Sequence, residues 1–368
     1  MEMTSGYVLI IIWIAISPML LKTIDTHEEI TVTGKREYRY KFLWAFIIFL
    51  PVIIMAGTRG SIGDTDAYRK MFQEMPQAFS GLNQYISTLT KDKGFYIFSA
   101  LIKIMVGANT KTYFLILAAI QGFCLVKIYR KYSINYTISV FLFLASSDYI
   151  SWMYNGIRQF MAVVITFASI GFLLQNNKIK YIIAILIASL FHQSALILIP
   201  FAFVVDGRAW NKKTIFFILA ALLAVAFIGQ FTNFLDNALA ETQYKNVVSD
   251  WKEFEDDGTN VLRVLVYSVP TILSYLGRRI IWEKDNRLIN LCVNMSIVST
   301  GLYVVSMFTS GIFIGRLPIY FSLFNYILLP WEIKNLFTEK SGRLMHAAMI
   351  AAYLVFYYYQ MHLVYGYF

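Results

Sequence analysis

The sequence predicts an all-α, polytopic transmembrane helical bundle, and two observations carry that prediction. Of its 368 residues, 58% are hydrophobic and only 15% are charged, whereas soluble domains carry about 25% charged residues. Apolar runs of membrane-spanning length recur along the chain, and no strand-like alternation of polar and apolar residues repeats between them. No polar stretch is long enough for a separate soluble domain, so we expect 1–368 to form a single integral membrane domain.

The apolar runs predict about 10 to 13 membrane segments, a number that allows for re-entrant or half helices. The candidate segments are 7–21, 42–57, 94–108, 112–128, 134–150, 154–174, 180–205, 214–231, 260–277, 288–309, 313–329 and 345–360.

Short basic loops between these runs set the predicted orientation. Lys and Arg concentrate in segments 22–41, 127–133, 175–180, 206–213, 278–287 and 332–343. By the positive-inside rule all six are expected on the cytoplasmic side, with the N-terminus outside. The net charge of +10 therefore reflects orientation, and no nucleic-acid-binding motif accompanies it. The two cysteines lie inside apolar runs, which excludes a disulfide framework.

Placing all six basic loops inside requires two irregular segments. Run 94–108 is expected not to cross fully, because Lys103 in its middle would be costly against lipid. Run 180–205 has basic loops at both ends, so it is expected to enter and return as two short helices. The alternative topology makes both runs full crossings, with 180–205 as one long helix.

The preferred topology places two sizeable loops on the outer face. One is the outer loop 58–93. The other is the outer acidic loop 232–259, which contains seven acidic residues and only two lysines.

The first polar constellation follows directly after run 42–57. Arg59 lies at the depth of a lipid head group, where a guanidinium can grip a phosphate with two parallel hydrogen bonds. Asp64 and Asp66 could accept a proton or bind a divalent cation, but a three-residue Asp-x-Asp match is a weak motif and we predict no metal site. The structural alternative is a turn in which Arg59 snorkels to the head groups and Asp64 caps the next helix.

The second constellation opens run 154–174 with Asn155, Arg158 and Gln159. An arginine inside a membrane segment indicates a functional site, and the first turn of a helix also favours an anion. The alternative is an Arg158 that snorkels to the outer head groups.

Two further residues could carry chemistry. His192 interrupts an apolar stretch, and a neutral imidazole could take a proton from a sugar hydroxyl; the alternative is a buried histidine bonded to a neighbouring helix. Arg316 lies between runs 288–309 and 313–329, where it is either another phosphate contact or an interface anchor. Sequence signatures of nucleotide, zinc and serine-hydrolase sites are missing.

Together these residues resemble the EpsG family of polysaccharide polymerases, which is related to the Wzy-type repeat-unit polymerases. The resemblance covers roughly residues 40–205, and beyond it the chain is similar to the family only in hydropathy and in having a sizeable outer loop. The matching residues are Arg59, Gly63, Asp64, Tyr68, Phe72, Gly94, Phe95, Asn155, Arg158, Gln159 and the run Phe191-His192-Gln193-Ser194-Ala195.

The resemblance implies a bacterial cytoplasmic-membrane glycosyltransferase with a GT-C-like fold that works at the outer face. Such enzymes transfer a growing chain from undecaprenyl diphosphate onto a new lipid-linked oligosaccharide repeat unit, and their product is capsule, exopolysaccharide or O-antigen. The donor and acceptor would be the partners in the bilayer, together with a chain-length regulator that nothing in the sequence identifies. The lipid-linked donor already carries the bond energy, so no cofactor is expected.

That chemistry assigns roles to the residues found above. Arginines at the membrane boundary would stabilise the diphosphate leaving group, and His192 or an aspartate would take the proton of the acceptor hydroxyl. The expected catalytic residues are His192, Arg158 and Asp64. The expected substrate-binding residues are Arg59, Asp66, Tyr68, Asn155, Gln159 and Arg316.

Two other functions fit parts of the pattern. A flippase or other transporter of lipid-linked oligosaccharides would use Arg158 and His192 along a path, but the polar groups gather at one face and no internal repeat is obvious. Another membrane glycosyl ligase would need much the same phosphate-gripping site as a polymerase.

Overall fold

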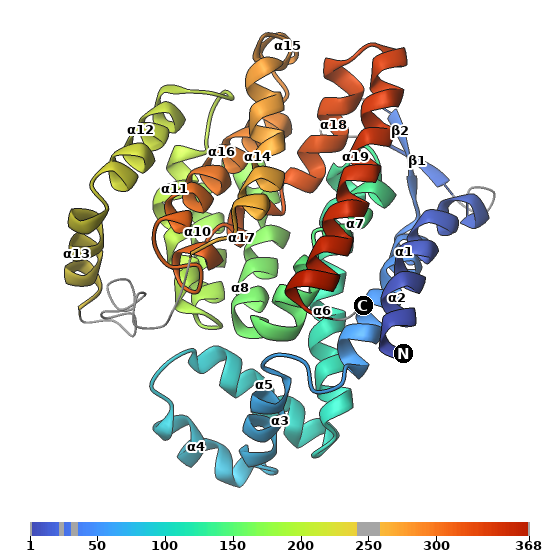
Figure 1. Cartoon of the computed structure of the whole chain (residues 1–368). Helices are drawn as coiled ribbons and strands as arrows, with labels where there is room; N and C mark the ends of the chain where they lie inside the picture. Colours follow the sequence, from blue (N-terminus) through green and yellow to red (C-terminus); the bar gives the residue numbers. More distant parts are fainter. Residues whose placement is uncertain (1, 22–25, 31–35, 241–257, 367–368) are drawn as a thin grey trace. The chain divides into compact units, whose positions relative to one another are not determined.

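The computed structural model describes residues 2–21, 26–30, 36–240 and 258–366. These residues are almost entirely helical (Figure 1), which confirms the all-α polytopic class. Within the described ranges the strands β1 (Thr26–Ile30) and β2 (Arg36–Tyr40) form one antiparallel pair that matches Thr26 with Tyr40. This pair lies within the basic segment 22–41, for which no strand is predicted.

Four described helical segments are long and apolar enough to cross a bilayer, and two bent helix pairs raise this number to six. The four are α6 (Thr110–Tyr132), α8 with α9 (Ile157–Leu174), α16 (Arg287–Met307) and α19 with η6 (Glu339–Val364). The bent pairs are α12 (Lys212–Ala226) with α13 (Ile228–Leu239), at 105°, and α14 (Val261–Leu276) with α15 (Arg278–Lys284), at 69°.

The number is smaller than the 10 to 13 segments predicted, because several apolar runs are short or divided. The shorter apolar helices are Gly6–Leu20, Phe42–Thr58, Tyr136–Ala145 and Gln193–Val204. Run 313–329 is divided among η5 (Ile314–Arg316), α17 (Ile319–Ser322) and α18 (Asn325–Leu336).

Both irregular segments of the predicted topology are broken or short in the structure. The helix α5 (Lys93–Val106) has only 14 residues, and Lys103 is buried within it. The Lys103 Nζ atom donates to the carbonyl oxygens of Gln73 (2.5 Å) and Met75 (2.6 Å) at the end of α3 (Thr65–Glu74), so the charge finds its partners inside the protein.

Run 180–205 divides at Leu190–His192 into separate helices, so the single long helix of the alternative topology is wrong. The pieces are α10 (Lys178–Ser189), η3 (Gln193–Ile197) and α11 (Leu198–Val204). The re-entrant path and the sidedness of every loop stay predictions. Of the predicted outer acidic loop, α13 includes the first residues, and 241–257 lie outside the described residues.

Asparagine side chains begin many of the helices and so fix where polar turns give way to apolar runs. Each accepts a hydrogen bond from a backbone N–H two or three residues later, an N-cap that contributes about 1 kcal/mol. These residues are Asn109, Asn135, Asn177, Asn211, Asn260 and Asn286.

The chain divides into two compact units, while the expectation of a single domain stays a prediction. Unit 1 consists of 1–172, 177–196 and 340–368, and unit 2 of 173–176 and 197–339. In unit 1, α1 (Glu2–Leu21) packs on α2 (Phe42–Thr58), and Trp13 Nε1 donates to the Ile48 carbonyl at 3.1 Å. The helix α2 packs in turn along α6 and α7 (Tyr136–Ala145).

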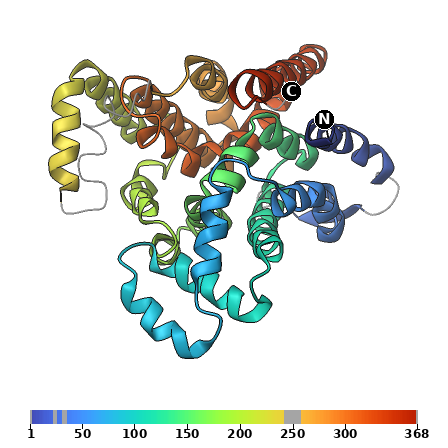
Figure 2. The same ribbon diagram turned by 60° about the horizontal axis from the view of Figure 1, so that its bottom comes forward.

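The helices α3, α4 (Leu82–Thr88) and α5 gather at one end of unit 1, with η1 (Phe79–Gly81) between α3 and α4 (Figures 1 and 2).

In unit 2, α16 lies at the centre and contacts α12, α14, α17 and α18. Its interior is partly polar: Thr271 Oγ1 shares hydrogen bonds with Ser296 Oγ (2.7 Å) and Thr300 Oγ1 (2.8 Å).

Candidate active site

Arg59 follows directly after α2 and is buried, with only 7% of the residue exposed. Its Nε donates to Thr65 Oγ1 at 3.1 Å and its Nη1 to the Ala56 carbonyl. The guanidinium lies 4.0 Å from the Phe114 ring centroid and 5.2 Å from that of Tyr154. Burial lowers the pKa of Arg59 to about 10. Arg59 therefore does not snorkel, and its buried Nη2 lacks a hydrogen-bond partner among the described residues.

The turn after Arg59 is clamped by a residue from a distant segment. Gly63 has φ +53°, and a Cβ placed on it would lie 1.5 Å from Asn155 Oδ1. That same oxygen accepts a hydrogen bond from the Asp64 backbone N–H at 3.2 Å. Asp64 stands before α3, but its side chain makes no capping hydrogen bond. The structure thus brings Gly63, Asp64 and Asn155 together, and only glycine fits at position 63.

Asp66 is held at the surface rather than in the interior. Its Oδ1 lies 2.7 Å from Arg69 Nη1, and the two side chains are 65% and 29% exposed, respectively. Ser61 Oγ donates to the same oxygen at 3.0 Å, and Arg69 also donates to the Arg59 carbonyl at 3.0 Å. Arg69 was missed from the sequence, although three-residue spacing on a helix pairs it with Asp66. No cluster of three or more metal-ligand side chains occurs among the residues described.

Arg158 lies in the first turn of α8 (Ile157–Ala168) and pairs with Asp92, which the sequence analysis missed. Arg158 Nη1 donates to Asp92 Oδ2 at 2.9 Å, and the side chains are 26% and 2% exposed, respectively. Burial raises the pKa of Asp92, and the neighbouring Arg158 charge opposes that rise. The only sequence signal for Asp92 is its place two residues before the Gly94-Phe95 pair, between two lysines.

Two tyrosines surround the Arg158 guanidinium. Tyr96 accepts a hydrogen bond from Arg158 Nη1 at 3.3 Å, and its ring centroid lies 5.8 Å from the Arg158 Cζ. Tyr68 is buried; burial raises the pKa of its hydroxyl, while the facing Arg158 opposes the rise. Arg158 is therefore set in a partly enclosed, aromatic surround, and Gln159 is buried beside it.

Close approach at Gly94 ties this pair to the segment that carries His192. The Gly94 N–H donates to the Leu190 carbonyl at 2.8 Å, and a Cβ on Gly94 would lie 2.7 Å from Leu190 Cβ. His192 is half-buried, and its Nδ1 lies 2.7 Å from Ser194 Oγ. The Gln193 backbone N–H also faces the Asp92 carboxylate.

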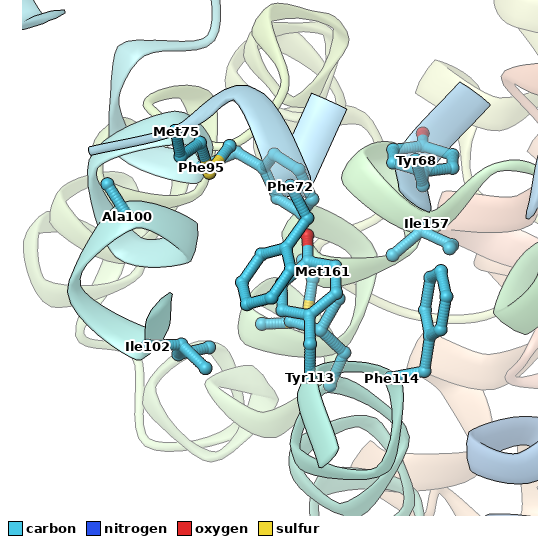
Figure 3. Close-up of a cluster of buried hydrophobic side chains, with 11 residues drawn as sticks. Tyr68, Phe72, Met75, Phe95, Ala100, Ile102, Tyr113, Phe114, Ile157 and Met161 are labelled. Atoms are coloured by element: carbon cyan, nitrogen blue, oxygen red, sulfur yellow. The ribbon is translucent and has the colours of Figure 1, made fainter. Parts of the chain in front are cut away.

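A buried, mainly aromatic cluster packs between the helices that carry several of these groups (Figure 3). Tyr68 packs edge-to-face on Phe95 with ring centroids 6.2 Å apart, and Phe72 stacks on Tyr113 at 4.1 Å. In Figure 3, Tyr68 lies beside Ile157, the residue before Arg158. The cluster packs α3, α5, α6 and α8 against one another. Predicted residues Arg59, Asp64, Asp66, Tyr68, Asn155, Arg158, Gln159 and His192 all lie in unit 1.

Arg316 is the exception, because it lies in η5 of unit 2 and is exposed. Its assignment as a phosphate contact stays a prediction.

The fold and the site define a multi-pass α-helical membrane protein with a desolvated arginine–aspartate pair at the start of a span. The EpsG family model matches residues 42–368, most of the chain, and the chain therefore belongs to the EpsG family. The match extends well beyond the region where the motifs lie. That family is associated with Wzy-type polymerases, which supports a polymerase-like role in exopolysaccharide biosynthesis at a membrane. No curated protein matches the chain, and no solved structure matches it.

Proposed function

We propose that this protein is a glycosyltransferase that joins undecaprenyl-diphosphate-linked oligosaccharide repeat units at the outer face of the bacterial cytoplasmic membrane. The observation that carries the proposal is Arg158, a partly enclosed guanidinium in the first turn of a membrane span. Charge develops on the diphosphate as the sugar–phosphate bond breaks, and a fixed guanidinium in a low-dielectric surround stabilises that charge strongly. The N–H groups of the first helical turn act in the same direction.

The reaction needs one bond formed and one broken. The acceptor hydroxyl oxygen attacks the anomeric carbon of the donor chain, and the bond from that carbon to the diphosphate oxygen breaks. The electron pair leaves with undecaprenyl diphosphate, and the hydroxyl proton passes to a base. His192 and Asp92 each lie two residues from the Gly94–Leu190 contact and are the candidate bases there. Asn155, Gln159 and Tyr68 would bind sugar hydroxyls.

An apolar groove along α1 and α2 in unit 1 supports the proposal, because it could accept a lipid tail. Its volume is about 370 Å³, and its lining is entirely apolar. The lining residues are Leu9, Ile10, Ile12, Trp13, Ile16 and Pro51. Pro51 lies eight positions before Arg59, which is about 12 Å along the helix. A prenyl chain whose diphosphate sits at the site would extend into the bilayer along this side of the helix.

The proposal is tested by polymer length in a deletion strain that expresses Arg158→Ala. We expect long polymer to vanish and single lipid-linked repeat units to accumulate at the outer face. Arg287→Ala, which removes an arginine from an ion pair in unit 2, is the matched control and should leave polymer length unchanged. Insertion of each variant is checked in isolated membranes.

The other outcomes of this experiment separate the competing functions. Units that accumulate on the cytoplasmic side would identify a flippase. Normal polymer that fails to reach its final attachment would identify a ligase. Normal, attached polymer in the Arg158→Ala strain would remove Arg158 from the site.

A further inference from the structure

Asp92 has a backbone conformation that side-chain-bearing residues rarely adopt. Its φ is +48°, in the left-handed region, where a non-glycine residue persists only if its surroundings hold it there. The first turn of α5 follows immediately and is fixed by the Gly94–Leu190 hydrogen bond. This strained position directs the carboxylate inward, where only 2% of the side chain is exposed.

The carboxylate is only half satisfied. Oδ2 pairs with Arg158, whereas Oδ1 is buried and makes no hydrogen bond of normal geometry among the described residues, although the Gln193 backbone N–H faces the carboxylate. A purely structural buried ion pair needs hydrogen bonds to its remaining lone pairs, because uncompensated desolvation makes it unstable. A bare, buried carboxylate oxygen next to a partly exposed arginine is better suited to a ligand or a proton.

Titratable groups from several elements lie around the Asp92–Arg158 pair. Arg158 lies on α8, Tyr68 on α3 and Tyr96 on α5, while Lys91 precedes Asp92 and His192 lies in the segment after α10. Arg158 makes the one ion pair with Asp92 in the described structure. Any anion that takes the place of Asp92 on the Arg158 guanidinium therefore leaves the buried carboxylate without its counter-charge.

We propose that Asp92 is the base of the transfer reaction, released for that role when the donor diphosphate takes Arg158 from it. This inference rests on the proposed function and adds to it a second catalytic group and an order of events. His192 is the less suitable base, because its Nδ1 is engaged with Ser194. It would instead orient the acceptor sugar.

Diphosphate oxygens replace Asp92 Oδ2 on the Arg158 guanidinium. The acceptor hydroxyl gives its proton to the freed carboxylate as its oxygen bonds to the anomeric carbon, and the diphosphate departs with the electron pair of the broken bond. When undecaprenyl diphosphate leaves, Arg158 returns to Asp92, and the proton passes to water.

Electrostatics supports both halves of this cycle. Burial raises the pKa of Asp92, while Arg158, the Gln193 N–H and Lys91 lower it. Removing Arg158 makes the carboxylate more basic at the moment when a base is needed, and the return of Arg158 makes it release the proton.

The test uses the full chain, purified and reconstituted in vesicles, with lipid-linked repeat units extracted from the deletion strain. Asp92→Asn keeps an amide oxygen that can accept from Arg158 but cannot take a proton. We expect kcat to fall about 100-fold, as is typical for loss of a general base, with little change in KM. Asp92→Glu should keep part of the activity and shift its pH profile. Asp206→Asn, from the ion pair in unit 2, is the matched control.

Several outcomes would overturn the proposal. They are an Asp92→Asn rate within threefold of wild type, a loss confined to KM, or a larger loss in His192→Gln than in Asp92→Asn. A confined KM effect would mean that Asp92 only positions Arg158. If Asp92→Asn does not fold, an unshifted pH profile in Asp92→Glu decides against the base. A wild-type protein that lengthens no lipid-linked unit would instead overturn the proposed function.

Discussion

A comparison of one arginine–aspartate pair from each unit shows how differently the same two residue types can be held. In unit 1, Asp92 and Arg158 are 2.9 Å apart, and the carboxylate is almost fully buried with one oxygen unpartnered. In unit 2, Asp206 and Arg287 are 3.8 Å apart, and their side chains are 25% and 43% exposed. The second pair lines an open cavity of about 620 Å³.

Arg287 of the second pair has further hydrogen-bond acceptors besides Asp206, whereas Asp92 of the first pair has one oxygen without a partner among the described residues. Arg287 also donates to the Leu173 carbonyl and to Asn176. The loop that carries Asp206 is fixed by Asn294, whose Nδ2 donates to the Val205 carbonyl at 2.9 Å. A wet, multiply bonded pair holds two loops together and adds little energy of its own. A dry pair with a missing partner indicates a functional site.

The largest expected difference is in stability when the arginine is removed. Arg158→Ala leaves a buried carboxylate alone, which costs about 3–5 kcal/mol, whereas Arg287→Ala should cost about 0–1 kcal/mol. Loss of Arg158 also raises the pKa of Asp92 further. A raised folded-state pKa means that the destabilisation is full above that pKa and disappears as pH falls towards the unfolded value.

Thermal unfolding in detergent at pH 7 and pH 4.5 measures this effect. The deficit of Arg158→Ala should shrink at the lower pH, and Arg158→Ala with Asp92→Asn should recover most of it at pH 7. An equal deficit at both pH values would mean that the Asp92 charge is not its cause.

A smaller effect is expected when the backbone around the first pair is disturbed. In Gly94→Ala the new Cβ meets Leu190 Cβ at 2.7 Å and the Leu190 carbonyl oxygen at 2.9 Å. Such overpacking costs about 1–3 kcal/mol. Under the proposed function it should also shorten polymer, because Asp92 and the His192 segment move apart. Gly60→Ala is the control, since nothing lies within 4 Å of its Cβ. Equal polymer length in both strains would show that the close contact at Gly94 does not serve the site.

The smallest effect is expected at the second aspartate. Asp206→Asn removes one charge from a partly exposed pair and should change the unfolding free energy by about 0–1 kcal/mol. Chemical denaturation in mild detergent checks this value. A loss as large as that of Arg158→Ala would mean that exposure does not distinguish the two pairs.

The helices and their main interruptions could be predicted from the sequence because they depend on local features. Apolar runs act within a few residues, and Lys103 marks an interrupted run by its charge alone, although its partners Gln73 and Met75 lie far away in sequence. The Asp92–Arg158 pair could not be predicted in this way, since Lys91-Asp92-Lys93 has the composition of a solvated loop. The clamp of Asn155 on Gly63 depends likewise on two segments that meet only in the folded chain.

The surroundings of Asp66 and Arg59 were not predictable from the sequence, and their roles in substrate binding stay predictions. Asp66 has a surface partner in Arg69, three residues later, which competes with any ligand. Arg59 follows an apolar run as a head-group anchor would, but the rings of Phe114 and Tyr154, from other helices, hold it inside.

The contact between Asp92 and Arg158 joins residues 66 apart in sequence, and the Gly94–Leu190 contact closes a still longer loop. During synthesis, a nascent chain that ends before α8 therefore holds the Asp92 carboxylate without its counter-charge, however many spans it has already inserted. The site becomes complete only after the segment that follows α10 has left the ribosome. A truncated product that stops before α8 carries the motif around Arg59 and the Gly94-Phe95 pair but lacks Arg158, the counter-charge of Asp92.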